Sequence, residues 1–171
     1  GDEFGWSVSI SGNYAIVGAR DESEGGDYAG AAYIYERGED GVWEEVGKHL
    51  ASDAQAFDGF GGSVSISGNC AMVGAGGEDE GGASAGAAYI YERGEEGVWE
   101  EVEKRLASDA QANDLFGSVS ISGNYAIVGA IGEAEGGASA GAVYISSLKQ
   151  QLVGVTVEAG ATVPTPTATD N

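Results

Sequence analysis

An internal repeat with a period of 56 residues constrains the fold of this chain more than any other feature. Residues 4–19 (FGWSVSISGNYAIVGA) return as residues 60–75 and, one residue shorter, as residues 116–130. A second segment, residues 30–37, returns as residues 86–93. A repeat of this length indicates one supersecondary unit per copy, stacked so that neighbouring copies bury a shared apolar core.

Each copy of the repeat reads as four short strands. Serine alternates with Val and Ile at the start of the repeat, which is the period of a half-buried strand. Gly12 and Asn13 follow, and this pair favours a two-residue hairpin turn. The strands predicted in the first copy are residues 7–10, 14–17, 31–36 and 42–46. Four strands in about 50 residues are typical of a propeller blade.

The number of strands predicts about three blades. Two strands precede Gly18, four fall in each complete repeat, and a final pair ends with residues 152–157. The predicted fold class is therefore all-β, with β-propeller blades of four antiparallel strands over residues 1–160. Residues 161–171 are rich in Thr and Pro and are predicted to be a linker or tail, either disordered or an O-glycosylated stalk.

Three blades are fewer than the four to eight with which propellers usually close. The chain is thus expected to be an arc of a longer propeller, a part of a ring formed by several copies, or an open stack. In each case the flanks, rich in Val, Ile, Ala and Tyr, are expected to need a cover, because exposed apolar faces of that size are unfavourable in water.

Charge and composition exclude several classes of function. The chain has 28 Asp and Glu against 7 Lys and Arg, a formal net charge of −21, which repels nucleic acid and anionic membranes. No apolar run is long enough to predict a membrane span. A single cysteine, Cys70, and a single histidine, His49, allow no internal disulfide and no zinc site built from Cys and His.

The paired Phe-Gly and Gly-Ala signatures, about a dozen residues apart and preceded by an aspartate, resemble the FG-GAP repeats of integrin α-chain propellers. They are more similar to the variant repeats of large extracellular proteins. The resemblance covers residues 2–147 and implies a propeller with an extracellular or cell-surface role in adhesion. The integrin calcium loop lies between the two signatures, where this chain has only Gly12 and Asn13, so that site is not carried over.

Acidic, glycine-containing loops follow each Gly-Ala signature and are candidate calcium sites, because Ca²⁺ prefers several oxygen ligands. The alternative is a solvated turn that keeps strand edges from associating, exposed on one common edge of the molecule. The carboxylates become fewer toward the third loop, which keeps Glu133 and Glu135. The candidate calcium ligands are Asp21, Glu22, Glu24, Asp27, Glu78, Asp79 and Glu80.

Two further residues recur once per repeat and are interpreted as structural. The aspartate before each Phe-Gly is expected to accept backbone N–H bonds and brace a turn. The phenylalanines are expected to be buried as wedges between blades, since a large ring needs cover. The residues concerned are Asp2, Asp58 and Asp114, with Phe4, Phe60 and Phe116.

Aromatic and titratable residues provide no catalytic constellation. Trp43, Trp99 and the tyrosines of the third strand are periodic, which favours packing between repeats over stacking on a sugar. His49 aligns with Arg105, which cannot act as a base, so it is expected to lie at the surface. No Gly-x-Ser-x-Gly elbow with a partner histidine occurs.

The sequence therefore predicts a noncatalytic extracellular or cell-surface scaffold. Its partner would be another protein, further copies of itself or further blades of the same propeller. The alternative is a calcium- or carbohydrate-binding adhesion module. An accessory part of a hydrolase, or an intracellular subunit of a larger complex, is a more distant alternative that the residues leave open.

Overall fold

The computed structural model describes residues 1–135, 137, 140–148 and 155–158, and in these residues the secondary structure is entirely β. Three four-stranded antiparallel sheets follow one another along the chain, each a simple meander. Blade 1 contains β1 (Phe4–Ser11), β2 (Tyr14–Ala19), β3 (Ala31–Arg37) and β4 (Trp43–His49). The predicted blades of four antiparallel strands are confirmed.

Blades 2 and 3 repeat the same order of strands. Blade 2 contains β5 (Ser63–Ser67), β6 (Cys70–Ala75), β7 (Ala87–Arg93) and β8 (Trp99–Arg105). Blade 3 contains β9 (Phe116–Ser122), β10 (Tyr125–Ala130), β11 (Ala142–Ser147) and β12 (Val155–Glu158). The predicted tail, residues 161–171, lies outside the described residues.

The two-residue hairpin predicted at Gly12-Asn13 joins β1 to β2 and recurs in the other blades. Gly12, Gly68 and Gly123 have φ values of 58°, 57° and 56°, a conformation that only glycine adopts at little cost. The turn fixes the register in which Ser11 faces Tyr14. The serines of the first strand therefore all point to one face of the sheet, and the Val and Ile residues to the other.

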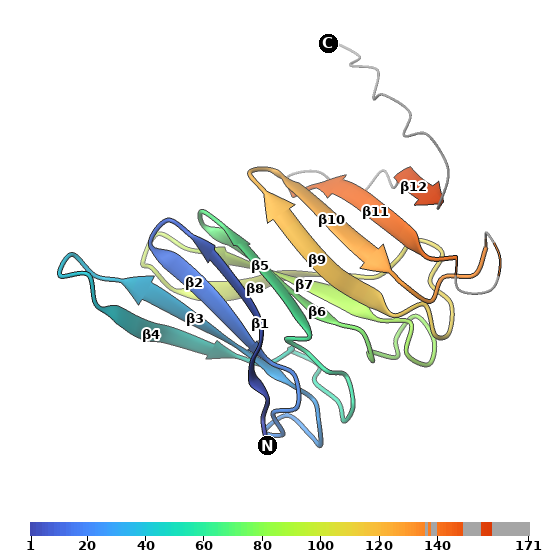
Figure 1. The fold of residues 1–171 in the computed structure, drawn as a ribbon, viewed down its shortest axis with the longest axis horizontal. Coiled ribbons are helices and arrows are strands. Elements are labelled where there is room, and N and C mark those ends of the chain that lie inside the picture. Colours follow the sequence, from blue (N-terminus) through green and yellow to red (C-terminus); the bar gives the residue numbers. More distant parts are fainter. Residues whose placement is uncertain (136, 138–139, 149–154, 159–171) are drawn as a thin grey trace, which may run out of the picture.

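The three blades form an open, propeller-like arc in which β5 lies between β1 and β9 and contacts both, as Figure 1 shows. One apolar core lies between blades 1 and 2, and a second lies between blades 2 and 3. Each blade has a leading face, which bears the Val and Ile of its first strand, and an opposite trailing face. The leading face packs against the trailing face of the preceding blade, which leaves one face of blade 1 and one of blade 3 uncovered.

The prediction that all three repeated phenylalanines are buried is confirmed at two positions and wrong at the third. Phe60 and Phe116 are buried, and their rings contact Tyr89 and Tyr144 edge to face at 5.3 Å. Phe4 is 57% exposed. The difference follows from the position of each ring, because Phe60 and Phe116 lie in cores shared with another blade, whereas the leading face of blade 1 is uncovered in this structure.

Candidate functional site

Each acidic loop surrounds one buried glutamate. Glu22, Glu78 and Glu133 are almost fully buried, and their carboxylates accept hydrogen bonds from the backbone N–H two residues on, at 3.1, 3.0 and 2.5 Å. The prediction that the acidic loops are simply solvated turns is wrong for these three residues. Each of these carboxylates points into its own loop, where it accepts a hydrogen bond from the loop backbone, and it is therefore buried instead of solvated.

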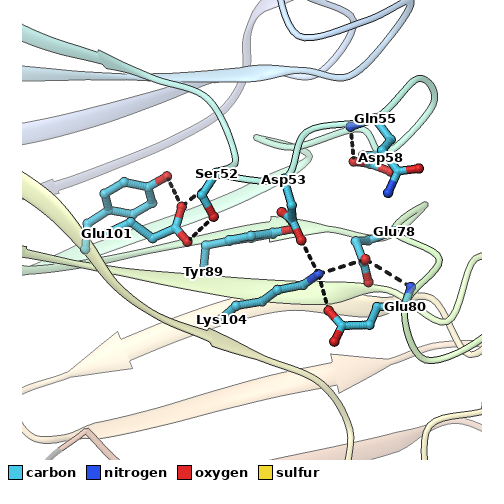
Figure 2. Close-up of polar contacts among 10 residues, drawn as sticks. Ser52, Asp53, Gln55, Asp58, Glu78, Glu80, Tyr89, Glu101 and Lys104 are labelled. Carbon is cyan, nitrogen blue, oxygen red and sulfur yellow. Dashed lines mark hydrogen bonds and ion pairs between the residues drawn. The ribbon is translucent and has the colours of Figure 1, made fainter.

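A lysine ammonium group lies among the carboxylates of the second loop (Figure 2). Lys104 Nζ, reaching over from β8, is 2.5 Å from Asp53, 2.8 Å from Glu78 and 2.7 Å from Glu80. Burial by itself lowers the pKa of Lys104, but the hydrogen bonds to these three carboxylates raise it above its usual value. The ammonium group is therefore charged and balances the only fully buried carboxylate of the cluster.

The first loop has the same arrangement. Lys48 Nζ, on β4, is 2.9 Å from Glu22 and also contacts Glu24. Lys48 and Lys104 each pair in register with a tyrosine of the third strand of their blade. In blade 3 the residue that pairs with the equivalent tyrosine, Tyr144, is Thr156.

The candidate calcium ligands thus separate into two groups. Glu22, Glu24, Glu78 and Glu80 lie around lysines, whereas Asp79 accepts a hydrogen bond from the backbone N–H of Ser84 at 2.6 Å. Asp21 and Asp27 belong to no close group of carboxylates among the described residues. Calcium binding remains a prediction, and an ion at the second loop would have to displace the Lys104 ammonium.

Asp53 is a member of this cluster that sequence reasoning missed. Its carboxylate also accepts a hydrogen bond from Tyr89 Oη at 2.8 Å. Burial raises the pKa of Asp53, but the hydrogen bonds from Lys104 and Tyr89 outweigh burial and hold it below the usual value. The sequence contained a signal for this role, because Asp53 recurs as Asp109 in the next repeat. The Asp109 carboxylate accepts the equivalent hydrogen bond from Tyr144 Oη at 2.6 Å.

The aspartates before Phe-Gly brace turns, as predicted, in two of the three repeats. Asp58 and Asp114 are buried and accept hydrogen bonds from the backbone N–H groups of Gln55 and Gln111, at 2.7 and 2.6 Å. Asp2 is exposed. In both cases the donor is the residue three positions earlier, so the aspartate braces the linker that joins its blade to the preceding one.

Serine hydroxyls join each blade to the next. Ser9 Oγ and Ser11 Oγ on β1 accept hydrogen bonds from backbone N–H groups of β5 and its turn, both at 3.2 Å. An equivalent row of hydrogen bonds, the serine ladder, connects β5 to β9. Its serine Oγ atoms accept from backbone N–H groups at 3.0–3.1 Å, and the pairs are Ser63 with Val119, Ser65 with Ile121 and Ser67 with Gly123. The polar side of the alternating first strand is thus the side that binds the next blade.

The contact between two neighbouring blades is called a seam. The following blade contributes the apolar side of its first strand to the seam. Val64 and Ile66 on the leading face of blade 2 are 7% and 4% exposed, and they share a core with Ile16 and Ile34 on the trailing face of blade 1. In blade 1 the equivalent residues are Val8, 69% exposed, and Ile10, 67% exposed.

The glycines of the two sequence signatures meet across each seam. A Cβ atom on Gly18 would lie 2.0 Å from the carbonyl oxygen of Gly61, and one on Gly74 would lie 1.8 Å from that of Gly117. Non-bonded atoms cannot approach so closely, so each Gly-Ala glycine must lack a side chain for the next Phe-Gly segment to pack on it.

Comparison with known families agrees with this geometry. The family model of the FG-GAP repeat matches residues 1–35, 43–91 and 99–146. The chain belongs to the FG-GAP repeat family. The second and third matches begin in the fourth strand of one blade and end in the third strand of the next. An FG-GAP unit therefore spans a seam and links two blades covalently.

A comparison with curated proteins gave no significant match to this FG-GAP chain. No helix that could cross a membrane occurs within the described ranges.

The periodic aromatic residues of the FG-GAP units pack between blades wherever a preceding blade exists. Tyr89, Tyr91 and Trp99 of blade 2 are buried, and the Trp99 ring contacts Tyr14 of blade 1 edge to face at 5.6 Å. In blade 1 the equivalent Trp43 is exposed. Packing is thus the role of these rings in the covered seam, and Trp43 is accessible because its face is open.

His49 lies in the first seam rather than at the free surface, contrary to the sequence-based expectation. Its ring packs 4.9 Å from that of Tyr91, and Nε2 is buried without a hydrogen-bond partner among the described residues. Burial lowers the pKa of His49 below 6.5. The imidazole is therefore neutral in the folded chain at neutral pH.

Acidification is expected to weaken the seam through His49. The folded-state pKa is depressed, so the unfolded chain binds the proton first, and the stabilisation is complete above about pH 6.5 and is lost as the pH falls below it. The test is the urea midpoint between about pH 8 and about pH 5, in wild type and in His49→Gln. The carboxylates titrate equally in both proteins, so wild type is expected to lose more stability. Parallel curves would contradict the assignment.

Proposed function

We propose that this FG-GAP chain is a noncatalytic scaffold of the cell surface or extracellular space, and that it acts by protein–protein contact through its two open blade faces. The observation that supports this proposal most directly is the leading face of blade 1. Phe4, Val8 and Ile10 of β1 are all more than half exposed, whereas their equivalents in blade 2, Phe60, Val64 and Ile66, are buried. An exposed group of large apolar side chains of this kind is characteristic of an interaction surface.

The cavity beside the innermost strands supports a role without catalysis. It has a volume of about 550 Å³, and its lining combines glycines and serines with the larger side chains of Trp6, Arg20, Phe57 and Ile131. The one carboxylate of the lining is Asp58, which is engaged by the backbone N–H of Gln55. The lining offers no histidine and no pair of carboxylates for acid–base chemistry.

The extracellular assignment rests on the FG-GAP family and on charge. Repeats of this family are typical of integrin-like extracellular and adhesion proteins. The net charge of −21 makes the surface a poor ligand for nucleic acid and favours solubility. A calcium-dependent adhesion module is the second candidate, favoured by the three carboxylates of Asp53, Glu78 and Glu80, whose ligand atoms lie within 4.8 Å of one another.

Site-specific photo-crosslinking in the producing cells tests the scaffold function. A photoreactive amino acid in place of Ile10 or Ile127, on the two open faces, is expected to give a crosslinked protein adduct. The same amino acid in place of Val98, an exposed apolar residue in the outer hairpin of blade 2, is the matched control and is expected to give none. Absence of adducts at both faces would overturn the proposal.

A further inference from the structure

We infer that the partner of the open faces is a second copy of this chain, docked head to tail so that blade 1 of each copy packs on blade 3 of the other. This inference rests on the proposed function and names its partner. The basis is that the two open faces are the two halves of a seam that the chain already forms twice.

The hydrogen-bonding half of that seam is present on blade 3 without a partner blade. Ser118, Ser120 and Ser122 on β9 are exposed, and they are the equivalents of the serines that form hydrogen bonds across the two closed seams. All of those serines accept from a backbone N–H except Ser7, whose hydroxyl donates to the carbonyl oxygen of Gly61 at 2.8 Å. The matching donors on a second copy are the backbone N–H groups of Val8 and Ile10. The equivalent N–H groups in blades 2 and 3, those of Ile66, Val119 and Ile121, donate to serines of the preceding blade.

The apolar half is equally complementary. Ile127 on the trailing face of blade 3 is exposed, whereas its counterparts Ile16 and Met72 are completely buried by the next blade. Val8 and Ile10 are the residues whose equivalents bury those side chains. Each open face thus exposes the residues that the other face is shaped to cover.

The signature glycines leave space for the same close approach. A Cβ atom on Gly129, the Gly-Ala glycine of blade 3, would meet nothing closer than Ser118 Cβ at 3.4 Å, and one on Gly5 would meet nothing within 4 Å. Their counterparts Gly74 and Gly117 are in contact in the closed seam. A head-to-tail docking would place Gly5 of one copy against Gly129 of the other.

The three blades of the structure set the size of the ring that two docked copies would close. A head-to-tail contact uses different surfaces on the two partners, so it propagates until a ring closes. Each chain contributes three blades, and propellers close with about four to eight. Two copies of these three blades provide six, which falls in this range. Repulsion between the acidic chains is screened beyond about 8 Å at physiological salt and does not prevent contact at packed faces.

The mass of the purified chain in solution tests this inference. Wild type is expected to have twice the 17.2 kDa of one chain by light scattering and native mass spectrometry at micromolar concentration. Val8→Asp and Gly129→Ala are each expected to give the single-chain mass with an unchanged circular dichroism spectrum, because both positions are uncrowded in the isolated chain. Val98→Asp, the same chemical change away from both faces, is expected to stay dimeric.

Mixing two variants distinguishes head-to-tail docking from symmetric pairing. Val8→Asp keeps an intact trailing face and Ile127→Asp keeps an intact leading face, so each is monomeric alone and the two together form a pair with one seam. A dimer of Ile127→Asp alone would overturn the head-to-tail geometry. A monomeric wild type would overturn the inference itself. If crosslinking in cells then still yields adducts, the scaffold function stands with a different partner, and if it yields none, both proposals fail.

Discussion

Gly74→Ala is expected to lower the free energy of unfolding by about 3 kcal/mol, the upper end of the range for overpacking a close-packed interior. The added Cβ would lie 1.8 Å from the carbonyl oxygen of Gly117, an atom of the backbone that cannot rotate away. The seam between blades 2 and 3 would have to open, and the serine ladder between β5 and β9 would lengthen with it. Urea denaturation followed by circular dichroism measures the loss.

Gly129→Ala is the matched control for this change, since it alters the same signature position in blade 3. Its Cβ has only an ordinary contact with Ser118 in the isolated chain, and its φ is not positive, so the free energy of unfolding is expected to stay the same or to rise by up to about 1 kcal/mol. Both substitutions are best compared in a Val8→Asp background, which blocks docking of a second copy. Equal losses at the two positions would contradict the role assigned to the Gly74–Gly117 contact.

These glycines explain the two sequence signatures of the family in physical terms. The Gly-Ala glycine of one blade and the Phe-Gly glycine of the next form a backbone-to-backbone contact, as at Gly18 with Gly61. The neighbouring phenylalanine fills the core beside that contact, as Phe60 does. The signatures are therefore two sides of one joint, which is why they recur together once per blade.

The sequence was sufficient to predict the fold because the repeat encodes each blade locally. Alternation, the glycine turn and the period give the strands and their order, and the structure confirms the four-stranded antiparallel blades. Periodicity failed at Phe4, because it assigns every copy the same neighbours. The leading face of blade 1 is uncovered in this structure, so equivalent residues such as Phe4 and Phe60 differ in burial although their local sequences agree.

The acidic loops were harder to predict, because charge alone does not report burial. Glu78 lies beside two exposed acidic residues in the sequence, and nothing local distinguishes it from Asp79 and Glu80. What separates it is the position of Lys104, which lies 26 residues away on β8. The role of the serine rows was not predicted either, because alternation indicates two faces of a strand but does not say that the polar face binds a neighbouring backbone.

Lys104→Met is expected to destabilise the chain by about 3 kcal/mol, because it leaves the buried Glu78 carboxylate without its counter-charge. Methionine keeps the length and apolar stem of the side chain, so the change is mainly one of charge. Asp53 would also lose its ion pair, which loosens the linker between blades 1 and 2. The loss is measured as the shift in the urea midpoint at neutral pH.

Glu80→Gln is the control for this change. The Glu80 side chain is largely exposed, so its ion pair with Lys104 contributes at most about 1 kcal/mol and its removal is expected to have little effect. If the two variants were destabilised equally, the effect of Lys104 would come from the surface and not from Glu78.

The effect of Ca²⁺ on the urea midpoints of wild type and Lys104→Met shows whether the cluster of Asp53, Glu78 and Glu80 is structural or binds a metal ion. With the ammonium group present, the carboxylates of Asp53, Glu78 and Glu80 are already neutralised in part, so millimolar Ca²⁺ is expected to leave the urea midpoint of wild type unchanged. In Lys104→Met the three carboxylates are unpaired, and Ca²⁺, a hard cation that takes oxygen ligands, is expected to restore part of the lost stability. A Ca²⁺-induced rise in wild type that is abolished by Glu78→Gln would instead establish the calcium-binding alternative, because it would show that the ion displaces the lysine from its carboxylates.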